Sequence, residues 1–322
     1  STGKIYPAFP RNRFPFLKKR HMDPSLKRYT FKAMGSYCEI QVYSDSRIEA
    51  KQLIQRLAGE VTRLEKKYSR FEPQSFLSDI NASHGNKLGI KVDSETQALF
   101  NHALSCYEQS EGLFDITAGI LHYIWDFQRG IVPTQGQIDE VLPHIGYHKL
   151  VAKKSRLFLP KNMQIDLGGL VKEYAADATA KLGRDLGITH GLINLGGDFA
   201  AIGPQPDEKP WTIGVANPKE DASLMAKIDI TRGGLASSGD YERFFEHEGK
   251  RYSHILNPKT GWPSSGLRAV SVASPLCAIS GSFATIAMLK DEEDGKKFLE
   301  ESNLSHVYMD SSEEIGGVGL KV

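Results

Sequence analysis

The residues with the clearest chemical potential lie at positions 166–177, which read DLGGLVKEYAAD. Gly168-Gly169 ends an apolar run and lets the backbone approach a ligand closely. A helix that starts after these glycines offers unpaired N–H groups and the positive end of its dipole, which attract phosphate, and Lys172 adds a mobile positive charge. The segment matches neither the GxxxxGK[ST] loop nor the GxGxxG fingerprint. It favours a site for a phosphorylated small molecule, although a tight turn without a ligand explains the glycines equally well.

Two other segments combine glycines, hydroxyls and carboxylates at expected strand ends. Gly196-Gly197-Asp198 interrupts an apolar strand, where a β-bulge is an equally good explanation. Residues 237–241 (SSGDY) bring the carboxylate of Asp240 into a turn, for which turn chemistry alone is a sufficient reason. Whether either segment takes part in a functional site therefore depends on the residues that lie near it in space.

His254 follows an alternating strand and precedes the turn sequence NPKTG, so its imidazole lies at a strand end where it can transfer protons. The chain has ten histidines, and any one of them is more often structural than catalytic. Phe114 and Asp115 in the segment FDIT could contact a ligand. Thr285 lies in the apolar helical run SFATIAML, where a threonine usually bonds its own helix backbone.

The elements that must position these residues alternate between strands and helices. The apolar alternation at 38–42 predicts a half-buried strand, and apolar residues at spacings of three and four over 54–68 predict an amphipathic helix. A second helix is expected at 95–109. The same patterns predict further strands at 163–167, 188–202, 211–215, 226–230 and 269–273. They also predict helices from 171 to about 187 and at 283–290, and a hairpin at 243–254. This order predicts one mixed α/β unit of two closely joined lobes.

The composition narrows the class of protein. The balance of 40 basic and 39 acidic residues in 322 gives a net charge of +1, so no global field recruits nucleic acid or an anionic membrane. The three cysteines cannot all pair and none lies in a CxxC spacing, which argues against a disulfide framework or a structural zinc site. No apolar run approaches the roughly 18–20 residues that span a bilayer.

Residues 1–28 differ from the rest of the chain. They are rich in Pro, Arg and Lys, include the run Lys18-Lys19-Arg20, and show no amphipathic period. We expect a solvated basic extension, and a tail, an arm or a membrane-proximal spacer all fit this composition. The folded unit is expected to cover residues 29–322.

Taken in order along residues 29–322, eight segments resemble the FAD:protein FMN transferase (ApbE) family. They are AMGS at 33–36, YSRFEPQSFLSDIN at 68–81, GLFDIT at 112–117, IDLGGLVKEYAAD at 165–177, INLGGDFAAIG at 193–203, SSGDYERFF at 237–245, RYSHILNPKTGWP at 251–263 and FATIAML at 283–289. The resemblance implies a T-fold-like α/β (α+β) fold whose two joined lobes hold FAD between them beside a magnesium ion.

The resemblance also implies an activity. Such an enzyme moves FMN from FAD to a threonine or serine hydroxyl of an acceptor flavoprotein and releases AMP. Most relatives work in the periplasm or on the periplasmic face of the inner membrane, so peripheral proximity to a membrane is expected. Two alternatives stay open: an FAD pyrophosphatase that yields FMN and AMP, and a flavin-binding or delivery protein without catalysis.

Carried over by position, the resemblance assigns roles to individual residues. The resemblance implies that eight residues contact FAD through its flavin, nucleotide, ribose, phosphates or pyrophosphate. They are Met34, Phe71, Leu113, Phe114, Asp115, Asp166, Lys172 and Ile255. Asp240 matches a position linked to activity in the family. Either Asp240 or His254 could take the proton from the incoming hydroxyl.

The expected magnesium site departs from the family pattern. Relatives use a backbone carbonyl, here that of Gly169, together with Asp-x-x-x-Thr on the late helix. Thr285 is present, but Gly281 occupies the aspartate position. Relatives commonly have glycine where this chain has Glu173, so Glu173 could supply the missing carboxylate. The alternative is that Glu173 is a solvated first-turn residue stabilised by the helix dipole.

Overall fold

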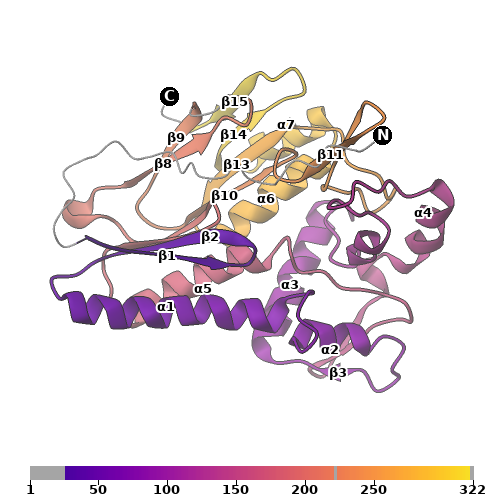
Figure 1. The fold of residues 1–322 in the computed structure, drawn as a ribbon, viewed down its shortest axis with the longest axis horizontal. Coiled ribbons are helices and arrows are strands. Elements are labelled where there is room, and N and C mark those ends of the chain that lie inside the picture. Colours follow the sequence, from indigo (N-terminus) through magenta and orange to yellow (C-terminus); the bar gives the residue numbers. More distant parts are fainter. Residues whose placement is uncertain (1–25, 221–222, 320–322) are drawn as a thin grey trace.

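An eight-stranded antiparallel sheet is the centre of the larger lobe (Figure 1). The computed structural model describes residues 26–220 and 223–319. In spatial order the strands of the sheet are β1 (Leu26–Ala33), β2 (Ser36–Tyr43), β6 (Gly191–Leu195), β7 (Asp198–Gly203), β10 (Gly234–Gly239), β13 (Ala269–Ser274), β14 (Ser305–Met309) and β15 (Ile315–Val318). Since β1 begins at Leu26, the last three residues of the expected extension belong to the sheet, and residues 1–25 lie outside the described ranges.

The two faces of this sheet are covered differently. Ile193 packs in the main core, which includes residues of the helices α1 (Arg47–Tyr68), α5 (Val171–Asp185), α6 (Cys277–Leu289) and α7 (Glu292–Glu301). Its neighbour Leu192 packs in a second cluster, under the hairpin of β8 (Trp211–Ala216) and β9 (Leu224–Ile230). Adjacent residues of a strand point to opposite faces, so one strand serves both cores. Within the two described ranges, no helix combines the length and apolar character needed to cross a membrane.

The smaller lobe contains mostly short elements. Its helices are α2 (Phe76–Ala82), α3 (Ser94–Gln109) and α4 (Gln135–Val141), and its sheet consists of β3 (Ile90–Lys91), β4 (Val151–Lys153) and β5 (Arg156–Phe158). It also contains the 3₁₀ turns η1 (Gly119–Tyr123), η2 (Leu142–His144) and η3 (Tyr147–Lys149). The fourth 3₁₀ turn, η4 (Pro206–Glu208), follows β7.

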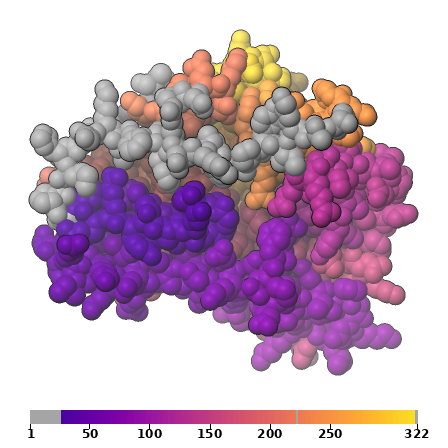
Figure 2. All heavy atoms as spheres, in the orientation of Figure 1, coloured from indigo at the N-terminus to yellow at the C-terminus, as the bar shows by residue number. Residues whose placement is uncertain are grey.

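Aromatic side chains join the smaller lobe to the hairpin of β11 (Phe244–His247) and β12 (Lys250–Ser253). The Trp125 ring lies 6.4 Å from that of Phe245 and 5.6 Å from that of Tyr252, measured between centroids. The indole Nε1 of Trp125 donates to the carbonyl of Gly261 at 2.8 Å. In the space-filling view the magenta residues of the smaller lobe accordingly lie beside the orange residues of this hairpin region (Figure 2).

Most elements agree with the sequence pattern. The apolar residues predicted to form one helix face are all buried in α1: Ile54, Leu57, Val61, Leu64 and Tyr68. The helix at 95–109 corresponds to α3, the hairpin at 243–254 to β11–β12, and the strands at 211–215, 226–230 and 269–273 to β8, β9 and β13.

Three predictions about elements need correction. Residues 163–167 form only one isolated β-bridge, from Gln164 to Ala118, and no strand, because the backbone of Ile165 bonds the side-chain amide of Asn81 at 2.7 and 3.0 Å. Residues 188–202 form two strands, since Gly196 and Gly197 both adopt positive φ and make a two-residue hairpin turn in place of a bulge. The late helix α6 begins at Cys277, earlier than the predicted 283.

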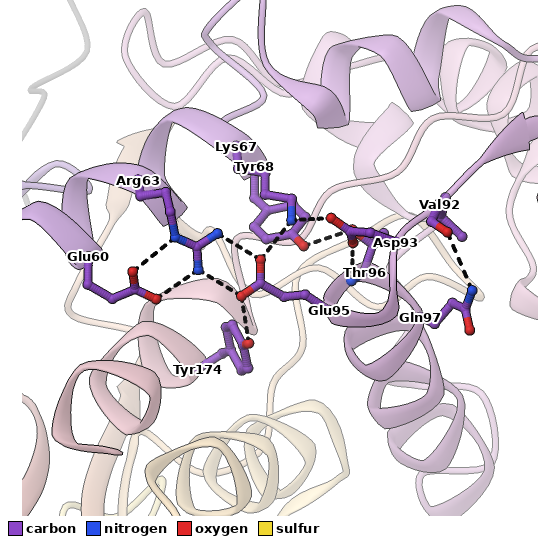
Figure 3. A network of polar contacts seen from close by, with 10 residues as sticks. All are labelled: Glu60, Arg63, Lys67, Tyr68, Val92, Asp93, Glu95, Thr96, Gln97 and Tyr174. Carbon is purple, nitrogen blue, oxygen red and sulfur yellow. Dashed lines mark hydrogen bonds and ion pairs between the residues drawn. The ribbon is translucent and has the colours of Figure 1, made fainter. Parts of the chain in front are cut away.

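A polar network ties α1, α3 and α5 together (Figure 3). The carboxylate of Glu95 accepts hydrogen bonds from Arg63 at 2.8 and 2.9 Å and from Lys67 at 2.7 Å. It also accepts one from the hydroxyl of Tyr174 at 2.9 Å. The bond from Arg63, with those from Lys67 and Tyr174, outweighs burial and lowers the pKa of Glu95 to about 2.

Replacing Glu95 with glutamine should lower the free energy of unfolding by about 1–3 kcal/mol, the usual range for hydrogen bonds to charged groups. The folded-state pKa of Glu95 lies below its ordinary value of 4.5. Its stabilisation is therefore present above that pH and lost as the pH falls toward 2. Denaturant unfolding at pH 7 and pH 3 should show the wild type and Glu95→Gln converging at the lower pH. Glu301→Gln, in an exposed pair with Lys297, is the control and should cost under about 0.5 kcal/mol.

Candidate functional site

A cavity of about 570 Å³ lies between the two lobes, a size typical of small-molecule sites. Its walls are drawn from the β1–β2 turn, the end of α1, the loop after α3, the start of α5, the turn after β10, the chain after β12, and α6. These segments are far apart in the sequence, and they include parts of all the motifs singled out above except 193–203.

The structure brings almost every predicted site residue to this cavity. The predicted residues that line it are Met34, Phe71, Leu113, Phe114, Asp115, Asp166, Gly169, Lys172, Glu173, His254, Ile255 and Thr285. Only Asp240 among the predicted residues is absent from the lining.

Asp240 is engaged elsewhere. Its Oδ2 accepts hydrogen bonds from Arg251 at 2.9 Å and from Arg268 at 2.8 Å, and its backbone carbonyl accepts a second bond from Arg251. A carboxylate that neutralises two guanidinium groups away from the cavity is badly placed to take a proton from a bound substrate. The geometry therefore favours His254 of the two candidate bases.

His254 has a defined proton arrangement. Its Nδ1 lies 3.1 Å from the carbonyl oxygen of Arg243, and its backbone N–H donates to the same oxygen at 3.0 Å. Because a carbonyl can only accept, Nδ1 carries the hydrogen and Nε2 is left as the acceptor. Burial, with the positive charges of Arg243 and Lys172 nearby, lowers the pKa of His254 to about 4. The imidazole is thus a neutral base at physiological pH.

Lys172, at the start of α5, provides a fixed positive charge. Its Nζ lies 3.0 Å from Oδ2 of Asp198, which is buried at the start of β7. Burial disfavours the charged form of Lys172, but the carboxylates of Asp198 and Glu173 outweigh this effect and raise its pKa. The lysine is therefore charged when a phosphate enters the cavity.

Glu173 is buried, with only 7% of its surface exposed, so the alternative of a solvated first-turn residue is wrong. Burial and the negative charge of Asp198 raise its pKa to about 8. Its Oε2 has no hydrogen-bond partner. A Cβ atom built on Gly281 would lie 2.6 Å from Cγ and 2.7 Å from Oε1 of Glu173. The glutamate from α5 therefore fills the space that a side chain at position 281 of α6 would need.

Oxygen atoms of Glu173, Gly169 and Thr285 could hold a cation at the cavity. Within residues 26–220 and 223–319, no three His, Cys, Asp or Glu side chains form a metal-binding group. A site would instead combine the carboxylate of Glu173 with the carbonyl of Gly169 and the hydroxyl of Thr285, all of which line the cavity. Oxygen ligands with few carboxylates suit Mg²⁺, which retains several waters. The unpartnered Oε2 of Glu173 fits this group of ligands.

Asp166 organises one wall of the cavity. Its Oδ1 accepts from the N–H of Gly168 at 2.8 Å, and its own N–H donates to the carbonyl of Ile116 at 2.8 Å, which brings the loop after α3 against residues 165–169. Its Oδ2 lies 3.3 Å from Nε2 of His122 and 3.5 Å from Nε of Arg70. Two cationic or polar side chains therefore face the cavity beside Asp166.

Asp115 shapes its own loop. Its carboxylate accepts from the N–H and hydroxyl of Thr117 at 2.8 and 2.6 Å and from the N–H of Tyr147 at 3.1 Å. Burial raises its pKa. Because these bonds occupy the side chain, contact of this loop with a nucleotide would come from backbone groups, and such contact stays a prediction.

The β1–β2 turn places Met34 at the cavity edge in a conformation that methionine rarely adopts. Met34 and Gly35 have φ of 51° and 70°, the pattern of a tight hairpin turn that favours asparagine and glycine. The N–H of Met34 donates to Oε1 of Glu65 at 2.6 Å, which stabilises the turn from α1. Nearby, Phe71 is 76% exposed, with the guanidinium of Arg70 4.3 Å from its ring centroid.

Sequence reasoning missed several residues that line the cavity: Glu65, Arg70, His122, Glu242 and Arg243. Arg70, Glu242 and Arg243 lie inside the segments YSRF and SSGDYERFF that carried the resemblance, so those segments held a usable signal. Glu65 and His122 lie outside all eight segments and only the fold brings them to the site.

The match to known proteins extends over most of the chain. The model of the ApbE family matches residues 34–309. Among curated relatives named FAD:protein FMN transferase, that of Haemophilus influenzae is 26% identical, covering 86% of this chain and 84% of the relative. That of Escherichia coli K12 is 28% identical, covering 88% and 83%. The crystal structure of the ApbE protein from Thermotoga maritima matches with a TM-score of 0.84 at 28% identity, covering 91% of this chain and 96% of that chain. The Pseudomonas stutzeri flavinyl transferase ApbE gives 0.80 at 25%, covering 92% and 96%.

A mixed α/β fold shared over most of its length with proteins named as transferases makes this chain an enzyme of the transferase class. The chain belongs to the ApbE family. The fold class expected from the sequence is confirmed.

Proposed function

We propose that this enzyme transfers FMN from FAD to a threonine or serine hydroxyl of an acceptor flavoprotein and releases AMP. One observation carries the proposal: a neutral base at His254 and a charged Lys172 face one cavity between the lobes, which also contains the buried carboxylate of Glu173. The printed names of the relatives support the same reaction.

Different residues of the cavity bind different parts of FAD. The exposed ring of Phe71, backed by Arg70, offers a flat face on which a flavin can stack. The ammonium of Lys172 and the N–H groups at the start of α5 attract the pyrophosphate. Phosphoryl-type transfer depends mainly on positioning and charge neutralisation, so this set of groups is sufficient for most of the catalysis.

In the proposed transfer one bond to phosphorus forms and one breaks. The acceptor oxygen forms a bond to the phosphorus on the FMN side, and the bond from that phosphorus to the bridging oxygen breaks, so that AMP leaves with the electron pair. The hydroxyl proton moves to Nε2 of His254, the ring nitrogen without a hydrogen. Lys172 remains protonated and neutralises charge on the transferring group.

Magnesium is part of this proposal. Glu173, the carbonyl of Gly169 and the hydroxyl of Thr285 would hold the ion, and the unpartnered Oε2 of Glu173 supports the fit. When bound, Mg²⁺ neutralises negative charge on the pyrophosphate. The periplasmic or membrane-associated location implied by the resemblance stays a prediction.

The reaction is tested by incubating the enzyme with FAD, Mg²⁺ and a flavoprotein domain that carries phosphoester-linked FMN on threonine, produced without its flavin. The expected products are covalent FMN on the domain, seen by intact mass, and one AMP per flavin transferred, with no transfer in EDTA. Free FMN with AMP and an unmodified domain would identify a pyrophosphatase instead. Intact FAD would identify a binding protein.

A further inference from the structure

Glu242 lines the same cavity but takes no part in the bond changes of the proposed transfer. Its Oε2 lies 4.0 Å from Nε2 of His254, the nitrogen that receives the substrate proton. The side chain of Glu242 is 42% exposed, so its carboxylate also reaches water in the cavity. Glu242 is therefore next to the base on one side and solvent on the other.

The turn between β10 and β11 holds Glu242 in this position. Before it in the chain, Asp240 is fixed by Arg251 and Arg268. After it, the guanidinium of Arg251 lies 4.0 Å from the ring centroid of Phe244. The same turn supplies the Arg243 carbonyl that orients His254. The turn between β10 and β11 thus supplies the carbonyl that accepts from Nδ1 of His254 and also the carboxylate that faces Nε2.

Partial burial of both side chains favours movement of a proton from His254 to Glu242, because burial disfavours the charged imidazolium and the charged carboxylate. The groups that act on Glu242 are Lys172 of α5, Asp198 of β7 and Arg243 of its own turn. Partial burial in the cavity wall, opposed by Lys172 and reinforced by Asp198, raises the pKa of Glu242 to about 7. The pKa of His254 is lowered to about 4, and His122 is a further positive neighbour when protonated. A carboxylate at this position accepts a proton that His254 does not retain.

We propose that Glu242 is a proton-relay residue, which takes from His254 the proton of the acceptor hydroxyl and passes it to solvent. The partly exposed Glu242 side chain first closes the 4.0 Å gap to hydrogen-bond distance, and the Nε2–H bond of the imidazolium then breaks as an O–H bond forms on Glu242. The proton then leaves to water, so His254 is neutral and Glu242 is ionised again before the next turnover. This inference rests on the proposed transfer to a hydroxyl.

Replacing Glu242 with alanine should slow single-turnover transfer of FMN to the acceptor domain by about 10- to 100-fold, within the range of acid–base contributions. FAD affinity should change little. Formate added at constant ionic strength should restore part of the rate in proportion to its concentration, because it can occupy the vacated space and accept the proton. Glu242→Gln, which fills that space, should be slow and insensitive to formate. Glu246→Ala, on the exposed β11 strand, is the control and should match the wild type.

The outcomes separate the relay from the function on which it rests. If the wild type does not modify the domain, the proposed function fails. If the wild type does and Glu242→Ala retains its rate, the relay is overturned. A slow Glu242→Ala enzyme that formate does not accelerate also overturns it, because that result assigns Glu242 a purely structural or electrostatic role. Thermal unfolding and FAD binding of both variants identify any loss of folding, and Glu242→Gln then provides the second test.

Discussion

Replacing His254 with asparagine should lower the rate of FMN transfer by about 10²- to 10⁴-fold while FAD binding is retained. The asparagine amide can still donate to the carbonyl of Arg243, as Nδ1 does in the wild type. It lacks a group at the position of Nε2. The substitution therefore removes the base and keeps the hydrogen bond that orients the side chain. Transfer is measured by intact mass of the acceptor domain in single turnover, and FAD binding by quenching of flavin fluorescence.

The control for this prediction is His247→Asn, on the outer strand β11, where the side chain is 46% exposed. It should behave as the wild type. A His254→Asn enzyme that retained more than a tenth of the wild-type rate would exclude His254 as the base. A variant that lost FAD binding together with transfer would instead assign the histidine to substrate binding.

Introducing aspartate at position 281 should damage the protein, although the resemblance to the ApbE family implies an aspartate there. The new Cβ would lie 2.6 Å from Cγ of Glu173, and the second carboxylate would be buried beside the first. Overpacking costs about 1–3 kcal/mol and a buried unpaired charge adds to it, so Gly281→Asp should lower the free energy of unfolding by about 3 kcal/mol or more. Thermal and denaturant unfolding at neutral pH measure the loss.

The double variant Glu173→Gly, Gly281→Asp should recover most of that stability, because removal of the glutamate vacates the space that the introduced aspartate needs. The two substitutions are thus expected to be strongly non-additive. Stabilisation by Mg²⁺ in a thermal shift assay, without FAD, should be lost in Glu173→Gln and present in the wild type and the double variant. Equal stabilisation of the Glu173→Gln variant would show that this carboxylate does not hold the ion.

Local patterns in the sequence predicted much of the fold. The apolar spacing over 54–68 predicted α1 because its burial depends on one helix face only. The same kind of pattern failed at 163–167, where alternate apolar residues are buried in an extended segment whose pairing is limited to one isolated bridge between Gln164 and Ala118. Periodicity reports burial, and it does not distinguish a strand from a loop held by a side-chain amide.

The site was predictable where its residues share a motif. Gly169, Lys172 and Glu173 lie at the start of one helix, so a single segment placed all three at the cavity. Glu65 lies on α1 outside all eight segments, and only the fold, which brings the strained turn at Met34 against it, reveals its role. Asp240 is the opposite case: its motif suggested chemistry, and in the structure Arg251 and Arg268 bind its carboxylate.

The contact between Glu173 and Gly281 also limits how segments of this protein can be exchanged with those of relatives. A chimera whose α6 carries the aspartate implied by the family pattern has two carboxylates in the space for one. A chimera whose α5 carries the glycine implied by that pattern has none. Exchange of either helix alone therefore gives a defective protein, so α5 and α6 must be exchanged together.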